Sequence, residues 1–452
     1  MVCLGPVDTS AATQLRTAGL RFLCVYFLLY CRPWPLGDLP GTGRFLGWWN
    51  AGREWLIANV GKHGLGIERS LAPFPTGSGD TTRDWVAFVA MLALALVLTT
   101  VWSFVDVRTR QSWLGTLLRT GLRYVLAVAL LGYGTAKFGD GQFRALEPAE
   151  LTATWGDTSP MGVVWRFMGA SVAYTAFTGI VECGAGLLLL WRPTATLGGL
   201  LAAGAMTNVV LLNFCYDVPV KLYSSHLLLM ALLVVAADRQ RLLCVFLWHR
   251  AVSAAPGSAP RWSWRWPFLL TRALKWALVG WLLWNVGSGL VARLTAPPLP
   301  VSPFAGGFDV VTSVLDKEGR GVADGAAIGA TPASTTTTPT WRRVFVYDQR
   351  AGGGSGFFLL ARDANGASVF GNRVRFLSEP GAPPSAPPAN GSGSNGARRL
   401  QLGHRWRSDD ELELAVPQPD GVLRLVLRRL RREQFPLVQR GFHWVQEYPF
   451  NR

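Results

Sequence analysis

The fold is decided by a stretch that joins two strongly apolar runs through a polar turn: Asn208-Val-Val-Leu-Leu-Asn-Phe-Cys-Tyr-Asp-Val-Pro-Val-Lys-Leu-Tyr-Ser-Ser-His226. The two runs, 194–214 and 218–237, are each long enough to cross a bilayer as a helix. An unpaired charge is costly to bury in lipid, so the polar groups of this turn are expected to have partners or a function. The stretch predicts a membrane helix hairpin with a polar end.

The composition extends this prediction to most of the chain. Of the 452 residues, 50% are hydrophobic and only 16% are charged, which is unusual for a soluble protein. Long apolar runs of the kind expected for membrane-spanning helices recur along the sequence. They cover 15–31, 85–105, 119–138, 173–191, 194–214, 218–237 and 268–292. We therefore expect about seven transmembrane helices.

The formal charge of +16 is explained by the loops between these helices. Basic residues gather in the second, fourth and sixth connections, whereas the other connections are acidic or mixed. The basic residues are Arg108, Arg110, Arg119, Arg123, Arg192, Arg239, Arg241, Arg250, Arg261 and Arg265. By the positive-inside rule, these loops and the N-terminus are cytoplasmic, and everything after about residue 296 lies outside. A nucleic-acid partner is not needed to explain the charge; the lipid bilayer is the expected one.

The first outer loop contains an aromatic segment, 43–60, with three tryptophans among charged residues. It is typical of an interfacial helix, and the alternative is a helix packed on the outer face of the bundle. The same loop ends in Thr81-x-x-Asp84, which predicts a helix cap. A later outer segment, 140–174, is amphipathic and interrupted by proline, so we expect a partly helical loop that covers the bundle.

From residue 297 the sequence changes to short segments of strand composition. They are 308–315, 341–347, 357–361, 368–377, 400–406, 412–416, 422–430 and 435–439. Two low-complexity inserts, 326–340 and 379–397, are expected to be disordered loop tips. The aromatic end, 440–452, is expected to pack back or to dock a partner. The predicted organisation is 1–116, two helices with a long outer loop; 117–246, a four-helix core; 247–296, a basic loop and last helix; and 297–452, an exported small antiparallel β-domain.

Polar side chains gather at the outer ends of the predicted helices. They are Asp80, Lys137, Asn213, Cys215, Asp217, Lys221 and His226. Such a polar mouth is typical of sites for quinones, protons or small solutes. Asp217 and Lys221 are spaced to pair with each other, and His226 can exchange a proton near neutral pH. The alternative is that these are the solvated charges of a hairpin loop, with Ser224 as a helix cap.

One carboxyl group, Glu182, lies about nine residues inside a predicted helix. An ionisable group at that depth is costly unless it is paired or protonated. Asn208 on the next helix is at a comparable depth, and we expect a Glu182–Asn208 hydrogen bond. Spacings typical of metal sites, nucleotide-binding loops and serine hydrolases are absent from the sequence.

The block 117–246 resembles the DoxX-like family of bacterial membrane proteins. The resemblance depends on three features: Gly132-Tyr-Gly-Thr-Ala-Lys-Phe138, Glu182-Cys-Gly-Ala-Gly-Leu-Leu-Leu-Leu-Trp-Arg-Pro-Thr-Ala195, and the glycine-rich helix that ends in Asn213. It implies a four-helix core in the bacterial inner membrane. Because some members of that family are subunits of quinone-linked or other membrane oxidoreductase complexes, the resemblance also implies such a role.

These observations support two hypotheses for the function. In the first, the chain is a redox subunit in which a quinone enters between the core helices. Lys137, Asp217, Lys221 and His226 then handle protons at the mouth, Glu182 is the buried acceptor, and Asn208, Asn213 and Cys215 contact the cofactor. In the second, the helices are an anchor for an exported β-domain that binds another envelope component. Whether the chain is an enzyme depends on which hypothesis holds.

Overall fold

The computed structural model describes 11–31, 43–73, 77–106, 112–139, 141–156, 158–252, 265–296, 302–316, 341–348, 357–376, 400–418 and 421–439. The chain divides into two compact units. The helical unit comprises Met1–Arg144 and Ser171–Thr295, and the barrel unit comprises Ala145–Ala170 and Ala296–Arg452. Each unit has a hydrophobic core of its own. The two predicted inserts and the segment 440–452 lie outside the described residues.

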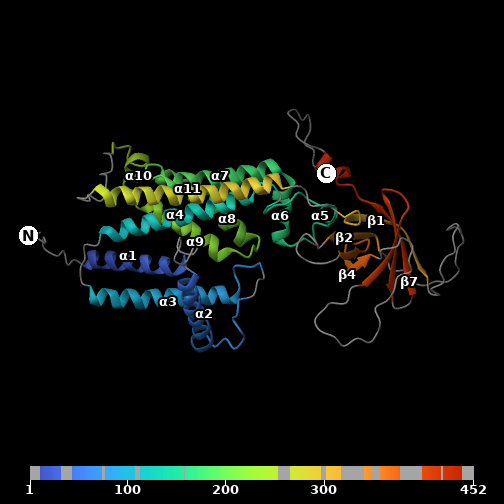
Figure 1. The fold of residues 1–452 in the computed structure, drawn as a ribbon, viewed down its shortest axis with the longest axis horizontal. Helices are drawn as coiled ribbons and strands as arrows, with labels where there is room; N and C mark the ends of the chain where they lie inside the picture. The colour runs from blue at the N-terminus through green and yellow to red at the C-terminus, as the bar shows by residue number, and fades with distance from the viewer. Residues whose placement is uncertain are drawn as a thin grey trace, which may run out of the picture. The chain divides into compact units, whose positions relative to one another are not determined.

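Each of the seven apolar runs forms a helix in the helical unit, as predicted (Figure 1). They are α1 (Ala11–Tyr30), α3 (Thr82–Val105), α4 (Ser112–Ala136), α7 (Val172–Leu190), α8 (Ala195–Cys215), α9 (Lys221–Ala236) and α11 (Arg265–Thr295). Within the described residues, five of them, α3, α4, α7, α8 and α11, are long and apolar enough to cross a membrane. The apolar helix α9 is shorter, with 16 residues.

Four of these helices form a closed ring. Helix α4 packs on α7, α7 on α8, α8 on α9, and α9 packs back on α4. Glycines permit the closest of these approaches: a Cβ atom on Gly134 of α4 would lie 2.7 Å from the carbonyl oxygen of Gly179 on α7. Helix α1 packs on α3 and α4, and α11 packs on α4.

The connection between α1 and α3 contains α2 (Gly43–Asn59), which continues into a π-helical turn, η2 (Val60–Gly64). The predicted helix is therefore present, and its side chains Phe45, Trp48 and Trp55 are exposed. Figure 1 shows α2 at a steep angle to α1 and α3. The predicted cap at the end of this loop is confirmed, because Thr81 and Asp84 form a reciprocal capping box at the start of α3.

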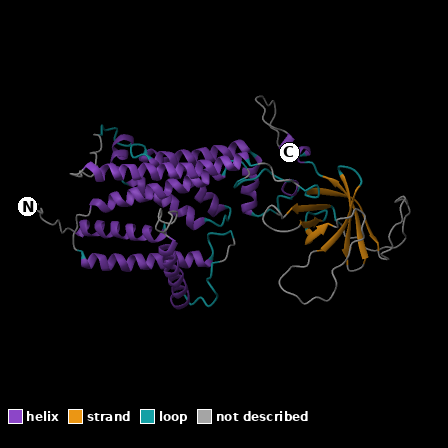
Figure 2. Cartoon of the chain, viewed as in Figure 1, coloured by secondary structure: helices purple, strands orange, loops and turns teal. Residues whose placement is uncertain are grey.

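The barrel unit is a closed seven-stranded barrel with strand order β1 to β7 (Figure 2). The strands are β1 (Gly306–Asp316), β2 (Arg343–Asp348), β3 (Phe357–Arg362), β4 (Ser368–Phe376), β5 (Leu400–Trp406), β6 (Glu411–Gln418) and β7 (Gly421–Arg429). Their inward side chains, such as Leu412, Leu414 and Val416, fill the core. Alternation of buried and partly buried residues along β6 explains why the sequence predicted strands here.

Two expectations for this unit were wrong. The predicted eighth strand is instead a 3-10 turn, η4 (Arg432–Gln434), followed by α12 (Pro436–Gln439). Pro436 has no N–H for a sheet and its fixed φ favours the first turn of a helix. The sheet is also not purely antiparallel, because β4 and β5 are parallel, with Val374 opposite Leu400. A long connection between two strands allows this direction, since the chain can return to the same end of the sheet.

The segment before α7 belongs to the barrel unit. It contains α5 (Pro148–Leu151) and α6 (Pro160–Ala170). Helix α5 packs on β1, where Gly307 leaves room for Pro148: a Cβ atom at Gly307 would lie 2.8 Å from the Pro148 Cβ. Arg343 of β2 also donates a hydrogen bond to the Thr152 carbonyl, at 3.4 Å. The expected outer loop is therefore partly helical, as predicted, and by its contacts it groups with the barrel.

Candidate functional site

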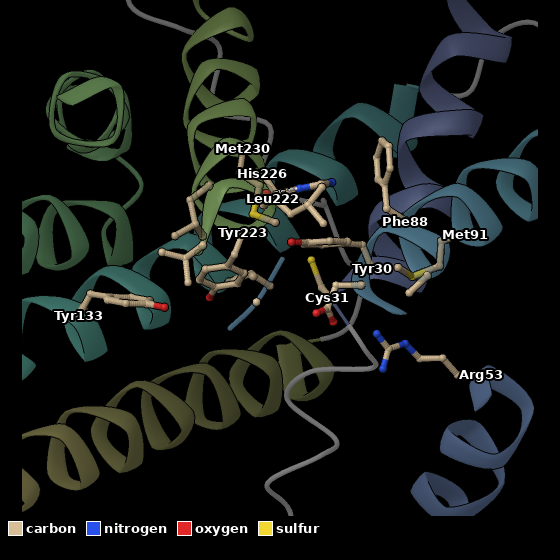
Figure 3. Close-up of a pocket in the computed structure, with 16 residues that line it drawn as sticks. Tyr30, Cys31, Arg53, Phe88, Met91, Tyr133, Leu222, Tyr223, His226 and Met230 are labelled. Carbon is tan, nitrogen blue, oxygen red and sulfur yellow. Dashed lines mark hydrogen bonds between the residues drawn. The ribbon is translucent and has the colours of Figure 1, made fainter. Parts of the chain in front are cut away.

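A pocket of about 450 Å³ lies within the helical unit, with walls from α1, α2, α3, α4 and α9 (Figure 3). Much of the wall is apolar and includes Phe88, Met91 and Met230. The polar side chains on the wall include three phenols, a thiol, an imidazole and a guanidinium. They belong to Tyr30, Tyr133, Tyr223, Cys31, His226 and Arg53. An apolar pocket with a few polar groups is typical of a site for a small organic molecule.

His226 is fixed in one orientation at this wall. Its Nδ1 lies 2.6 Å from the Leu222 carbonyl oxygen, so Nδ1 carries the hydrogen. Its Nε2 shares a hydrogen bond with the Tyr26 hydroxyl, at 2.5 Å. The Tyr30 ring stacks on the imidazole, with ring centroids 3.9 Å apart. The sequence predicted that His226 is a proton carrier at an open mouth. Instead it is buried, 6% exposed, and both ring nitrogens already have hydrogen-bond partners.

Unlike the ring nitrogens of His226, the tyrosine hydroxyls on the wall lack hydrogen-bond partners in the described residues. Within the described part of the chain, no hydrogen bond is present for the hydroxyls of Tyr30, Tyr133 and Tyr223. Tyr133 and Tyr223 come from α4 and α9, and their ring centroids are 5.9 Å apart. Figure 3 shows the Tyr133 hydroxyl pointing toward Tyr223, and the Tyr30 hydroxyl pointing toward the α9 side of the pocket. A bound molecule with acceptor oxygens would satisfy these donors.

Charged side chains that the sequence analysis identified stabilise the turn between α8 and α9. The Asp217 carboxylate accepts a hydrogen bond from Lys221 Nζ at 2.7 Å, which confirms the predicted pair. The Asp80 carboxylate accepts from the backbone N–H groups of Lys221 and Leu222, at 2.7 and 2.9 Å. Asp80 thereby satisfies two of the unpaired donors at the start of α9. Because Leu222 and Val220 line the pocket, Asp80 positions one of its walls.

Replacing Asp80 with alanine is expected to destabilise the helical unit by about 1–2 kcal/mol, since capping side chains contribute about this much. Asp217→Asn is the matched control, because the Asp217 side chain is 82% exposed and asparagine tolerates the left-handed backbone of this residue, φ 50°. Such surface changes are usually within about 0.5 kcal/mol. Thermal unfolding of the two variants in detergent measures the difference. Equal losses for both would show that Asp80 has no capping role.

A second polar feature lies between α4 and α7. Lys137 Nζ is 2.5 Å from Glu182 Oε2, and their side chains are 7% and 4% exposed. The expected partner of Glu182, Asn208, is exposed on α8. Residues two apart on a helix lie about 200° apart around its axis, so Asn208 points away when the neighbouring Met206 is buried. The predicted Glu182–Asn208 bond was therefore wrong, and the partner is Lys137.

Two further residues that the sequence predicted as cofactor contacts, Asn213 and Cys215, do not line the pocket. Asn213 is buried and donates to the Ser224 hydroxyl at 2.9 Å, which fixes the α8–α9 turn. Ser224 in turn donates to the Lys221 carbonyl within α9, so it does not cap the helix as expected. Cys215 is exposed at the end of α8. In the described ranges, no three His, Cys, Asp or Glu side chains are grouped to hold a metal ion.

Part of this chain is similar to YwoB of Bacillus subtilis (strain 168), an uncharacterized protein. The two are 36% identical over 124 residues, which are 27% of this chain and 79% of YwoB. This chain belongs to the YwoB family. No protein-family model and no solved structure matches it.

The similarity to YwoB covers little more than a quarter of the chain. The residues that line the pocket come from widely separated segments of the sequence. Of the predicted site residues, His226 lines the pocket, Lys137 and Glu182 pair with each other, and Lys221, Asp217 and Asn213 hold the adjacent turn. The structure does not bring Asn208 or Cys215 into the pocket. Sequence reasoning missed Tyr30, Tyr133 and Tyr223; the signal was the placement of Tyr223 three residues before His226, on the same helix face.

Proposed function

We propose that the helical unit is a quinone-binding membrane module of the DoxX-like type and acts as a redox subunit in the bacterial inner membrane. The single observation that carries the proposal is the pocket with three tyrosine hydroxyls that have no protein acceptor in the described structure. A quinone is flat and apolar and has two carbonyl oxygens. It matches an aromatic wall and separate hydroxyl donors.

The proposed topology has seven membrane spans, with the N-terminus inside and the barrel unit outside. Its support is the alternation of basic and acidic connections, together with a helix at each of the seven apolar runs. The proposed DoxX-like core is the ring of α4, α7, α8 and α9.

A bound quinone would supply two-electron redox chemistry, and the chain would supply donors and a route for protons. Tyr30, Tyr133 and Tyr223 would donate hydrogen bonds to its oxygens. The side chain of Tyr133 is also close enough to Glu182 to interact electrostatically with it. Glu182 and Lys137 together can hold a proton in apolar surroundings, so this pair is the proposed proton store next to the pocket. His226, with both nitrogens occupied, would fix the Tyr30 ring.

A binding experiment tests this proposal. We expect the purified full-length protein in nanodiscs to bind a tail-less naphthoquinone, measured by quenching of tryptophan fluorescence. Each of Tyr30→Phe, Tyr133→Phe and Tyr223→Phe should weaken binding about 2- to 10-fold, since a neutral hydrogen bond contributes about 0.5–1.5 kcal/mol. The matched control is Tyr216→Phe, an exposed tyrosine outside the pocket. No saturable binding, or equal binding by the triple phenylalanine variant, would contradict the proposal.

The second candidate is an anchor whose barrel binds another envelope component. The observation that favours it is that the barrel unit has a complete core of its own and incorporates the segment Ala145–Ala170. Co-purification from native membranes separates the two candidates. If the triple phenylalanine variant keeps both its protein partner and its cellular function, the anchor role is favoured over the quinone role.

A further inference from the structure

An arginine cluster lies at the end of the helical unit opposite the α8–α9 turn. Arg119 of α4 donates hydrogen bonds to the Asp238 carboxylate and to the Thr196 hydroxyl of α8. Thr196 also donates to Asp238, which follows α9. These contacts join α4, α8 and the end of α9. Burial acts to raise the pKa of Asp238, but the hydrogen bonds from Thr196 and Arg119 outweigh it and hold the pKa below its ordinary value. The carboxylate is therefore charged.

Further arginines surround this one carboxylate. Arg123 is four residues after Arg119 on α4, is 6% exposed, and lies over the Tyr124 ring at 5.0 Å. Arg192 interacts electrostatically with Arg123, and Arg241 of α10 (Arg239–Phe246) interacts with Asp238. Arg119, Arg123 and Arg241 thus place three positive charges in the region of the single negative charge of Asp238. Positive charge in excess at the end of an apolar bundle attracts an anion.

The buried hydrogen-bond donors of this cluster are incompletely satisfied. The Nε atoms of Arg119 and Arg123 are both buried, and neither has an acceptor among the described residues. An unsatisfied buried donor is costly, most of all when it is charged, so buried donors normally have partners. A phosphate group offers several acceptor oxygens and pairs well with guanidinium groups.

The direction of the two side chains places their charges near the end of the bundle. In a helix, side chains are tilted toward the N-terminus, and long basic side chains extend their charge toward the membrane surface. Arg119 and Arg123 on α4 (Ser112–Ala136) are therefore directed toward the start of α4. Arg192 follows α7 by two residues, and Asp238 follows α9 by two residues, so their backbones lie at helix ends. This is the level of lipid headgroups for a helix that crosses the bilayer.

We propose that Arg119 and Arg123, with Arg192 beside them, form a binding site for a phosphate group, either in the headgroup of an anionic phospholipid or as free phosphate. Asp238 and Thr196 hold Arg119 in position for it. The site is separate from the pocket, and it requires no quinone chemistry. It would tie the ends of α4, α7 and α9 to the membrane surface through one shared anion.

The test uses the full-length protein in nanodiscs. The lipids compared are phosphatidylglycerol and phosphatidylcholine with the same acyl chains, and a third arm adds inorganic phosphate against chloride at equal ionic strength. We expect phosphatidylglycerol to raise the melting temperature above that in phosphatidylcholine and to be retained through purification in detergent. Arg123→Gln should lower this retention about fivefold, which is the effect of one basic residue at an anionic surface.

Arg293→Gln is the matched control, because it removes an equal charge from the other end of the bundle, where Arg293 contacts the Thr135 carbonyl. A response to inorganic phosphate without a lipid preference supports the site and assigns it a water-soluble ligand. The proposal is overturned if neither lipid nor phosphate changes the melting temperature, or if Arg123→Gln and Arg293→Gln retain lipid equally. Should Arg123→Gln not fold, Arg119→Gln is compared with Arg293→Gln in the same way.

Discussion

Replacing Glu182 with leucine is expected to lower the free energy of unfolding of the helical unit by about 3–5 kcal/mol. The reason is the charge that remains: Lys137 is 8% exposed, and without its partner at 2.5 Å it is an uncompensated ammonium group in an apolar bundle. Lys137→Met should lower the free energy of unfolding by a similar amount, because it leaves the Glu182 carboxylate buried without a partner. Loss of helical circular dichroism during chemical denaturation in detergent measures both variants.

The double variant Lys137→Met with Glu182→Leu separates a charge effect from a packing effect. It contains neither charge, and replacing a buried ion pair with apolar side chains of similar size is often neutral or stabilising. We therefore expect the double variant to recover most of the stability lost by either single variant. If its loss equals the sum of the two single losses, the two side chains are not coupled, and an uncompensated charge is not the cause of either single loss.

Gly134→Ala is expected to destabilise the same helix pair by about 3 kcal/mol or more, the upper part of the range for overpacking. A Cβ atom on Gly134 would lie 2.5 Å from Cys183 Sγ, 2.7 Å from the Gly179 carbonyl oxygen and 2.9 Å from the Cys183 backbone nitrogen. Two of these three atoms belong to the backbone of α7 and cannot move alone. Helices α4 and α7 would have to separate, and this movement would also disturb the nearby Lys137–Glu182 pair.

The chain provides a matched control two residues away. Gly132 is on the same helix, but a Cβ atom there would have no neighbour within 4 Å. Gly132→Ala is therefore expected to be neutral or to stabilise α4 by up to about 1 kcal/mol through helix propensity. Thermal unfolding of the two alanine variants under identical detergent conditions makes the comparison. A similar melting temperature for both would show that α4 and α7 do not depend on close backbone contact at Gly134.

The elements of the fold could be predicted from the sequence, because their signals are local. Apolar length defines α3 or α8, and alternation defines a strand such as β6. The predictions failed where the local signal was short or ambiguous. Residues 435–439 have strand composition, but Pro436 begins a helical turn there. The direction of β5 relative to β4 depends on the route of a long connection, which strand composition does not encode.

The candidate site was predicted only in part, for a related reason. The polar residues of the α8–α9 turn and Glu182 were identified correctly as unusual, since charge in an apolar run is visible in the sequence. Their partners were not: the Tyr26–His226 hydrogen bond joins residues 200 positions apart, and the unpaired tyrosines of the pocket lie on α1, α4 and α9. A partner of that kind depends on which helices are neighbours and on how each is rotated about its axis.

The sequence by itself determined that a region of apolar helices is followed by a β-rich region, because hydrophobic length and periodicity are properties of contiguous residues. Only the tertiary structure decided that Glu182 pairs with Lys137, that Asp80 caps α9, and that three tyrosine hydroxyls share a pocket without protein partners among the described residues. The physical reason is that packing brings together side chains from separate segments. Those contacts follow from the closed ring of helices and the glycines that permit it, rather than from any single stretch of chain.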